Sequence, residues 1–95
     1  MKSLQSHLQD KLKDKKFAEI FEEEKQILSL SFAVLQLREK YGLTQAKLAK
    51  LAGITQQQLS RFETGTNCNI STFLKICMAL NVQITLKPLK KKLSA

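Results

Sequence analysis

The sequence predicts a mainly α-helical fold, a bundle of about five to six helices with an N-terminal helical arm and one short C-terminal strand. Apolar residues recur every three or four positions through most of the 95 residues, as one face of a helix requires. Gly, Thr and Asn stand between these segments, where helices begin and end. Near the C-terminus the spacing changes to strict alternation, which is typical of a strand.

The arm is predicted to occupy residues 1–26. A ridge of leucines spaced four apart marks a first short helix: Leu4, Leu8 and Leu12. Asp14 can cap a second helical stretch. The apolar side of that stretch, with one acid within it, comprises Phe17, Ile20, Phe21, Glu24 and Leu28. Because an apolar ridge must be covered, the arm either folds back on its own core or binds a partner protein.

The helical pattern continues from Ile27 to Tyr41 and ends at Gly42. No Pro or Gly interrupts residues 16–41, so the pattern is compatible with one long helix. A break within residues 26–31 is also compatible, because the apolar face shifts and two serines occur there. The sequence leaves both arrangements open.

Two short helices joined by a tight turn are predicted by residues 43–65, LTQAKLAKLAGITQQQLSRFETG. Thr44 and Thr55 can each cap a helix N-terminus. Gly53 can end the first helix in the left-handed conformation that Gly adopts at little cost, and Gly65 closes the second helix. The inward faces comprise Leu48, Ala49 and Ala52 in the first helix and Leu59 and Phe62 in the second. Small residues at the contact let the helices cross steeply, which describes a helix-turn-helix.

The second helix of this motif leaves polar side chains outside: Gln56, Gln57, Ser60, Arg61 and Thr64. Gln can bond bidentately to adenine and Arg to guanine in the major groove, and Ser or Thr can reach bases or phosphates. A merely solvated helix face would carry similar residues, but here the caps, the turn glycine and both apolar stripes agree on one motif. We therefore predict that the chain binds double-stranded DNA.

A further helix is predicted over residues 70–80, with Asn69 as its N-cap and Asn81 as a left-handed stop. Its buried stripe is expected to comprise Phe73, Leu74, Ile76, Cys77 and Leu80. Together with the motif, this helix places the DNA-binding domain at residues 27–81.

The predicted strand begins at Val82, turns Ile84 and Leu86 to the same side, and ends at Pro88. No other segment is typical of a strand partner, and an unpaired strand leaves its backbone N–H and C=O groups open. Pairing with the same strand of a second copy is favoured, because a dimer presents two recognition helices to DNA. The sheet edge of a partner protein, or an extended tail packed on the helices, are the alternatives. Residues 82–95 are thus the candidate dimerisation segment.

The charge and composition of the chain limit the functions that it can have. The net charge is +8, yet residues 1–26 are neutral, whereas residues 27–69 carry +3 and residues 70–95 carry +5. Basic residues around and after the motif are expected to strengthen DNA binding by releasing counterions from phosphates. No apolar run is long enough to cross a bilayer and no signal peptide is evident, so a cytoplasmic protein is expected.

Catalysis and metal binding are disfavoured. Cys68 and Cys77 lack the spacing of a metal site, and His7 is the only histidine, so no metal or cofactor is expected and both thiols are expected to be reduced. Neither a nucleophile elbow nor a Gly-rich phosphate loop occurs, which argues against an enzyme.

The chain resembles the Cro/C1-type (XRE) helix-turn-helix domain of phage repressors through GLTQAKLAKLAGITQQQLSRFETG and the following ISTFLKICMALNV. The resemblance implies that Gln45 contacts a phosphate, that the recognition helix reads base edges, and that Arg38 and Glu63 form a largely buried ion pair. The loop departs from the family pattern, because Thr66 replaces the usual basic residue and no Pro follows. The expected DNA-contacting set is Gln45, Thr55, Gln56, Gln57, Ser60, Arg61, Thr66 and Asn67.

The flanking segments resemble HigA-type antitoxins of type II toxin–antitoxin systems, through LKDKKFAEIFEEEKQILSLSFAVLQLREKYGLTQ and ALNVQITLKPL. This resemblance implies a homodimer that neutralises a HigB/RelE-like mRNA-cleaving toxin in a heterotetramer and represses its own operon. The implied toxin-binding set is Leu4, Leu8, Leu12, Phe17, Ile20, Phe21 and Glu24. A stand-alone phage-type regulator, whose arm only completes the fold, is the alternative.

Overall fold

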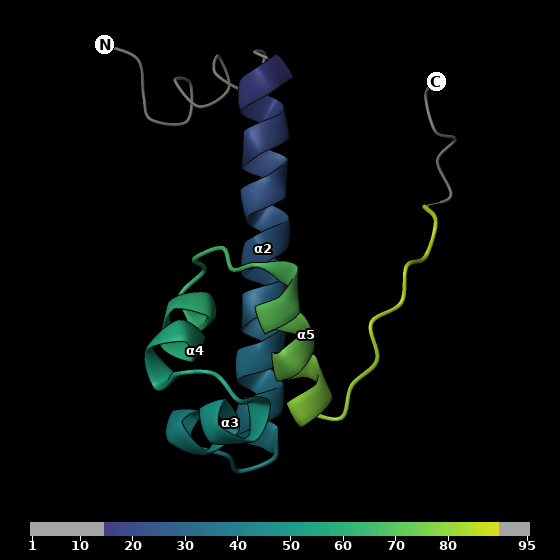
Figure 1. Cartoon of the computed structure of the whole chain (residues 1–95). Coiled ribbons are helices and arrows are strands. Elements are labelled where there is room, and N and C mark those ends of the chain that lie inside the picture. The colour runs from purple at the N-terminus through teal and green to yellow at the C-terminus, as the bar shows by residue number, and fades with distance from the viewer. Residues whose placement is uncertain (1–14, 90–95) are drawn as a thin grey trace.

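The computed structural model describes residues 15–89 and contains four α-helices in that range (Figure 1). They are α2 (Lys15–Lys40), α3 (Gln45–Ala52), α4 (Gln56–Glu63) and α5 (Ile70–Ala79). The predicted short helix with the leucine ridge lies outside the described residues. The fold is thus mainly helical as predicted, but the expected count of five to six helices is not confirmed in residues 15–89.

One continuous helix, α2, extends over 26 residues and settles the question that the sequence left open. Ser31 does not break it, because its buried hydroxyl donates to the carbonyl of Leu28 at 2.9 Å within the same helix. The expected domain boundary between residues 26 and 27 therefore falls inside α2.

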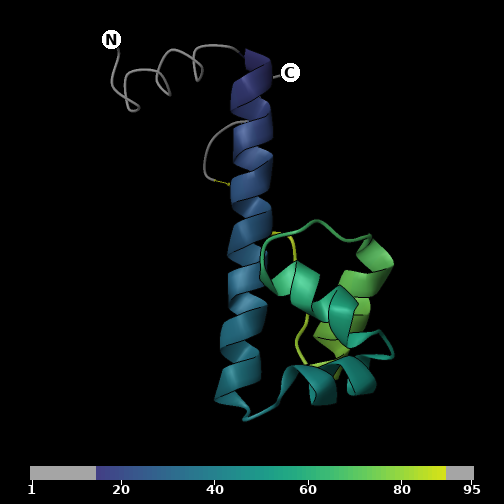
Figure 2. The same ribbon diagram turned by 90° about the vertical axis from the view of Figure 1, so that its left-hand side faces the viewer.

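The three shorter helices pack against the C-terminal half of α2, and its N-terminal half extends beyond them (Figure 2). In that extension every side chain from Phe21 to Gln26 is exposed. The described part of the arm therefore does not fold back on the core. The buried cluster at the centre of the bundle comprises Val34, Leu48, Ala49, Ala52, Leu59, Phe62, Ile76 and Leu80.

Helix α5 contributes Ile76 and Cys77 to the core, and Leu80, which caps its C-terminus, is buried as well, as predicted. Phe73 is half-buried, and its ring centroid lies 5.5 Å from that of Phe62. The prediction of a buried Leu74 is wrong, because this side chain is 43% exposed. It lies on the opposite side of α5 from Ile76, where no element covers it in the described part of the chain.

A glycine is needed at position 65, just after α4, for two reasons. Its φ is +94°, in the region that side chains rarely adopt, and the following N–H of Thr66 donates to the carbonyl of Arg61 at 3.0 Å. A Cβ at this position would lie 2.5 Å from Cδ2 of Leu28 in α2. The glycine therefore lets the loop after α4 approach α2 closely.

The C-terminal residues 82–89 form an extended tail and not the predicted strand (Figure 1). Asn81 does adopt the predicted left-handed conformation, with φ +59°. Of the three residues predicted to point one way, Val82 is half-buried, whereas Ile84 and Leu86 are exposed. The physical reason is pairing: a strand needs a neighbour for its backbone groups, and residues 15–89 of a single chain offer none.

Both thiols are free: Cys77 is buried in α5, and Cys68 is half-buried in the loop before it. Burial raises the pKa of each thiol, and at Cys68 it outweighs the opposing effect of the Phe73 N–H.

In the described residues, none of the helices combines the length and apolar character needed to cross a membrane.

Candidate nucleic-acid interface

Caps hold both ends of the two-helix motif, as the sequence predicts. The hydroxyl of Thr44 accepts a hydrogen bond from the Lys47 N–H at 3.1 Å and starts α3. Gly53 ends α3 with φ +72°. Thr55 starts α4 with a capping box, because its hydroxyl accepts from the Gln58 N–H and its own N–H donates to the Gln58 side chain. The orientation of α4 relative to α3 is therefore fixed at the turn.

The outer face of α4 presents the predicted polar side chains. Gln56, Gln57 and Arg61 are exposed, and Ser60 is half-buried. Leu59 and Phe62 on the opposite face are buried in the core. The core thus holds α4 by its apolar side and leaves amide and guanidinium groups free to bond to base edges.

Thr64 is oriented differently from the other outer residues. Its hydroxyl donates to the carbonyl of Arg61 at 2.8 Å, so it serves the end of its own helix.

The loop after α4 adds a polar hollow of about 220 Å³ beside the recognition helix. It brings Arg61 together with the exposed Thr66 and Asn67, two residues predicted for DNA contact. The full lining comprises Gln58, Arg61, Phe62, Thr66, Asn67, Cys68, Asn69 and Thr72. It contains one cationic side chain and no acid, which suits the approach of a phosphate.

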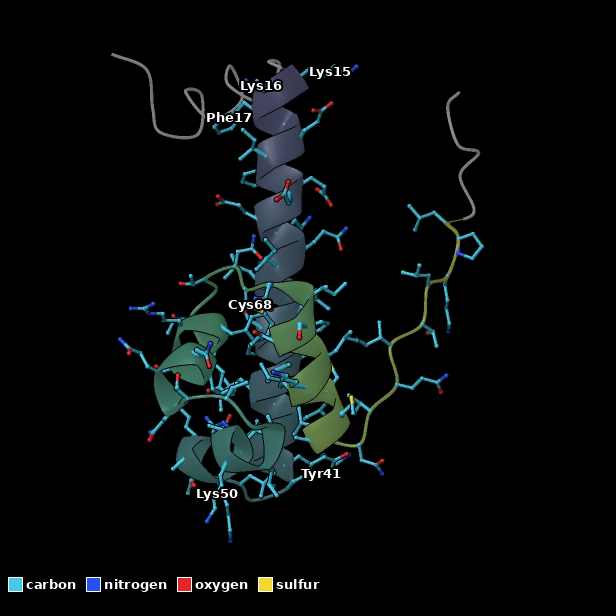
Figure 3. The ribbon with its side chains drawn as sticks, viewed as in Figure 1. Lys15, Lys16, Phe17, Tyr41, Lys50 and Cys68 are labelled. Atoms are coloured by element: carbon cyan, nitrogen blue, oxygen red, sulfur yellow. The ribbon has the colours of Figure 1, made fainter. Side chains whose placement is uncertain are left out.

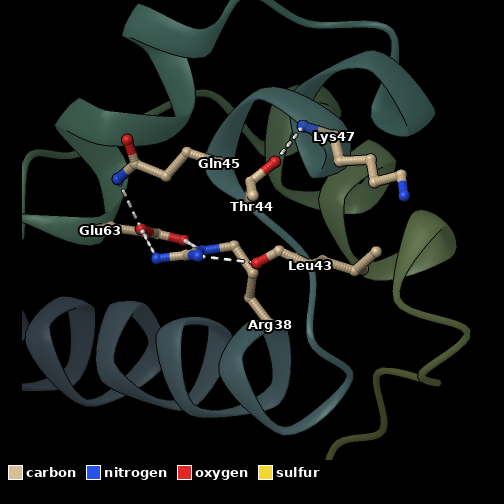
Figure 4. Close-up of polar contacts among 6 residues, drawn as sticks. All are labelled: Arg38, Leu43, Thr44, Gln45, Lys47 and Glu63. Atoms are coloured by element: carbon tan, nitrogen blue, oxygen red, sulfur yellow. Dashed lines mark hydrogen bonds and ion pairs between the residues drawn. The ribbon is translucent and has the colours of Figure 1, made fainter.

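A largely buried ion pair connects α2 to the end of α4, as the family resemblance implies (Figure 4). Arg38 Nε donates to one carboxylate oxygen of Glu63 at 2.7 Å, and Nη2 donates to the other at 3.1 Å. The side chains are only 13% and 3% exposed. The hydrogen bond that Arg38 donates to the Glu63 carboxylate raises the pKa of Arg38 and outweighs the lowering effect of burial, and the negative charge of Glu63 adds to the rise. Nη1 of the same guanidinium donates to the carbonyl of Leu43 at 2.9 Å, just before α3.

Gln45 joins this network, which the sequence did not predict. Its Nε2 donates to Glu63 Oε1 at 2.8 Å, and the side chain is half-buried (Figure 4). No local signal reveals a contact between residues 18 positions apart. The role of Gln58 was also missed, but here the T-x-x-Q spacing of residues 55–58 is a readable capping-box signal.

The residues predicted for toxin binding are only partly described. Leu4, Leu8 and Leu12 lie outside the described residues. The rings of Phe17 and Phe21 are stacked, with centroids 6.5 Å apart. Phe17 lies near the N-terminal end of α2 (Figure 3). Ile20 is 49% exposed and Phe21 is 42% exposed, and Glu24 is exposed one turn further on. An apolar surface with acidic residues beside it therefore stands away from the bundle.

An apolar groove of about 330 Å³ lies where the tail leaves the bundle. Its walls come from α2, α5 and residues 82–85. Two of the residues predicted for dimerisation, Val82 and Ile84, line it, whereas Leu86 is 96% exposed.

Comparison with known families assigns the domain. A family sequence model, described as helix-turn-helix, matches residues 34–87, which are more than half of the chain. The chain belongs to this helix-turn-helix family. The matched residues include α3, α4 and α5, so the helices that form the candidate interface are those that define the family.

The curated relatives are antitoxins. The chain is 40% identical over 58 residues to antitoxin HipB of Escherichia coli strain K12 and, equally, to antitoxin HipB of Escherichia coli O6:H1 strain CFT073. Each match covers 60% of this chain, and 66% and 62% of the respective relative. The chain thus spans slightly less than two thirds of the length of these relatives.

Among solved structures, three chains have a similar fold, and two of them come from complexes that contain HipB. A protein described as MDT protein aligns with a TM-score of 0.64 and 37% identity, over 67% of this chain and 92% of that chain. HipB(S29A) in complex with an O2 20mer aligns with a TM-score of 0.63 and 38% identity, over 67% and 90%. A chain of a HipA–HipB–O2–O3 complex aligns with a TM-score of 0.63 and 37% identity, over 67% and 92%.

Proposed function

We propose that this chain is an antitoxin that binds duplex DNA through α4, represses transcription of its own operon, and neutralises a protein toxin through the free half of α2. The observation that carries the DNA part is the capped, core-anchored α4 with Gln56, Gln57 and Arg61 exposed on one face. In this arrangement α4 lies in the major groove, and these side chains bond to base edges.

Phosphates are bound on both sides of the recognition helix. Gln45 at the start of α3 contacts the backbone on one side, and the hollow with Thr66 and Asn67 contacts it on the other. Thr55 and Ser60 add hydroxyl contacts. Phosphate contacts of this kind fix the register of the protein, whereas base contacts supply the specificity.

The antitoxin part is supported by the similarity to HipB and by the projecting helix. A surface that holds Ile20, Phe21 and Glu24 outside the bundle suits docking in a groove of another protein. The match to HipB favours a HipA-like toxin, whereas the resemblance of the arm to HigA-type antitoxins favours a HigB/RelE-like nuclease. The toxin class is decided by the protein that co-purifies.

Two copies act together in this proposal. The tail residues Val82, Ile84 and Leu86 of two chains pair as strands, which supplies the neighbour that residues 15–89 of one chain do not offer. The resulting dimer presents two copies of α4 to two half-sites.

The proposal is tested with a tagged full-length chain expressed in its native cell. We expect co-purification of one protein that arrests growth when expressed alone, and recovery of a preferred duplex from a random-sequence DNA pool. Recovery of a preferred duplex without any toxic partner would overturn the antitoxin part of the proposal and favour a stand-alone regulator. Recovery of neither would overturn both parts.

A further inference from the structure

The side chain of Gln45 is held by an unusual partner for a residue expected to touch DNA. Its Nε2 donates to Oε1 of Glu63 at 2.8 Å, and Glu63 is 3% exposed. A carboxylate only accepts hydrogen bonds, so the nitrogen end of the Gln45 amide must face Glu63. One N–H of the amide is occupied, and the second remains available as a donor.

The charge of Glu63 does not oppose a phosphate at this place. The guanidinium of Arg38 binds both carboxylate oxygens, at 2.7 and 3.1 Å, and neutralises them. The same guanidinium donates to Leu43 O at 2.9 Å, which fixes the chain just before α3 begins. Gln45, the first residue of α3, is therefore restrained through both its backbone and its side chain.

We propose that Glu63 is a positioning residue for DNA binding: its Oε1 orients the Gln45 amide so that the second N–H donates to a backbone phosphate of the bound duplex. The proposal rests on the DNA-binding function proposed above. It assigns to a buried acid, which itself touches no DNA, control over a contact made at the start of α3.

Matched variants isolate the hydrogen-bond acceptor at position 63. Arg38→Met with Glu63→Met removes the pair and the acceptor, and apolar replacement of a buried pair commonly preserves stability. Arg38→Met with Glu63→Gln also removes both charges but retains an oxygen that can accept from Gln45. The two double variants have the same net charge as the natural chain, so long-range attraction to DNA does not distinguish them.

The probe is the duplex that the natural chain selects from a random-sequence pool, measured by fluorescence anisotropy at several salt concentrations. We expect the Met/Met variant to bind about tenfold more weakly, as for loss of one hydrogen bond to a charged acceptor, and the Met/Gln variant to bind like the natural chain. Adding Gln45→Ala should cost about tenfold in the Met/Gln background and nothing in the Met/Met background. Because the Gln45 amide is neutral, the salt dependence should be unchanged throughout.

Equal affinity of the two double variants, or an equal effect of Gln45→Ala in both, would overturn the proposal while leaving the DNA-binding function intact. Failure of the natural chain to select any duplex would overturn both. If the Met/Met variant does not fold, the natural chain still decides. In the free protein, the heteronuclear NOE should show that the side-chain amide of Gln45 is rigid, whereas the exposed amide of Gln57 should be mobile. The resonances of the Gln45 amide should then shift when the duplex is added. A mobile Gln45 amide in the free protein would contradict the proposal.

Discussion

Replacing Gly65 by alanine should destabilise the bundle through two separable effects. The backbone at φ +94° disfavours any side chain, at about 1–2 kcal/mol. The new Cβ would also lie 2.5 Å from Leu28 Cδ2, so Leu28, which is 55% exposed, must leave its rotamer at about 0.5–1.5 kcal/mol. Loss of chain freedom in the unfolded state offsets about 0.4–1 kcal/mol. We expect the free energy of unfolding to fall by about 1–3 kcal/mol.

Gly42 provides the matched control. Its φ is +69°, and a Cβ there would meet no atom within 4 Å, so Gly42→Ala reports the backbone effect alone. Urea unfolding followed by circular dichroism gives both free energies, compared at equal slope. Gly65→Ala should cost more than Gly42→Ala, and the excess should disappear when Leu28 is also replaced by alanine. An excess that persists without Leu28, or no excess at all, would refute the role assigned to this contact.

Three further predictions concern binding and pH. Arg61→Ala should weaken binding to the selected duplex by about 1–3 kcal/mol at fixed salt, the value of a bidentate base contact, and unchanged affinity would remove Arg61 from the base-reading set. Deleting residues 1–26 should reduce rescue from the toxin more than affinity for DNA, and equal losses in the two assays would mean that the arm is structural. Burial raises the pKa of Cys68 and Cys77 in the folded state above the ordinary 9.0. The thiols therefore ionise more readily in the unfolded state, so the free energy of unfolding is unaffected below that pH and decreases as the pH rises above it. The urea midpoint should therefore fall between pH 8 and pH 10 by more in the natural chain than in a variant with both cysteines replaced by alanine, and equal falls would contradict the assignment.

Local signals predicted the motif well because the interactions that shape it are local. Thr44 and Thr55 bond to backbone groups three residues away, and Gly53 needs only its own φ. Apolar spacing likewise predicted the buried positions of Leu59 and Phe62. Each of these features depends on a few neighbouring residues, which the sequence displays directly.

Features that depend on distant partners were less accessible. Helix α5 carries apolar residues on most of its circumference, so spacing alone could not exclude Leu74 from the core. The bond from Gln45 to Glu63 joins the first residue of α3 to the last residue of α4, and its geometry exists only after the helices have packed. The alternation after Asn81 predicted a strand, but alternation describes only the side chains, and the hydrogen-bonding neighbour must come from elsewhere.

The unbroken α2 has a mechanical consequence. Its 26 residues form a rod about 39 Å long, with one end locked to α4 through Arg38 and the other end carrying Phe17 and Phe21. A molecule bound at the far end is therefore held at a set distance and azimuth from the recognition helix. One alanine inserted between Glu23 and Glu24 would rotate that end by about 100° without touching the bundle. The rotation of the N-terminal half of α2 about the helix axis, and not only its amino-acid composition, thus determines where a bound partner lies relative to the DNA duplex.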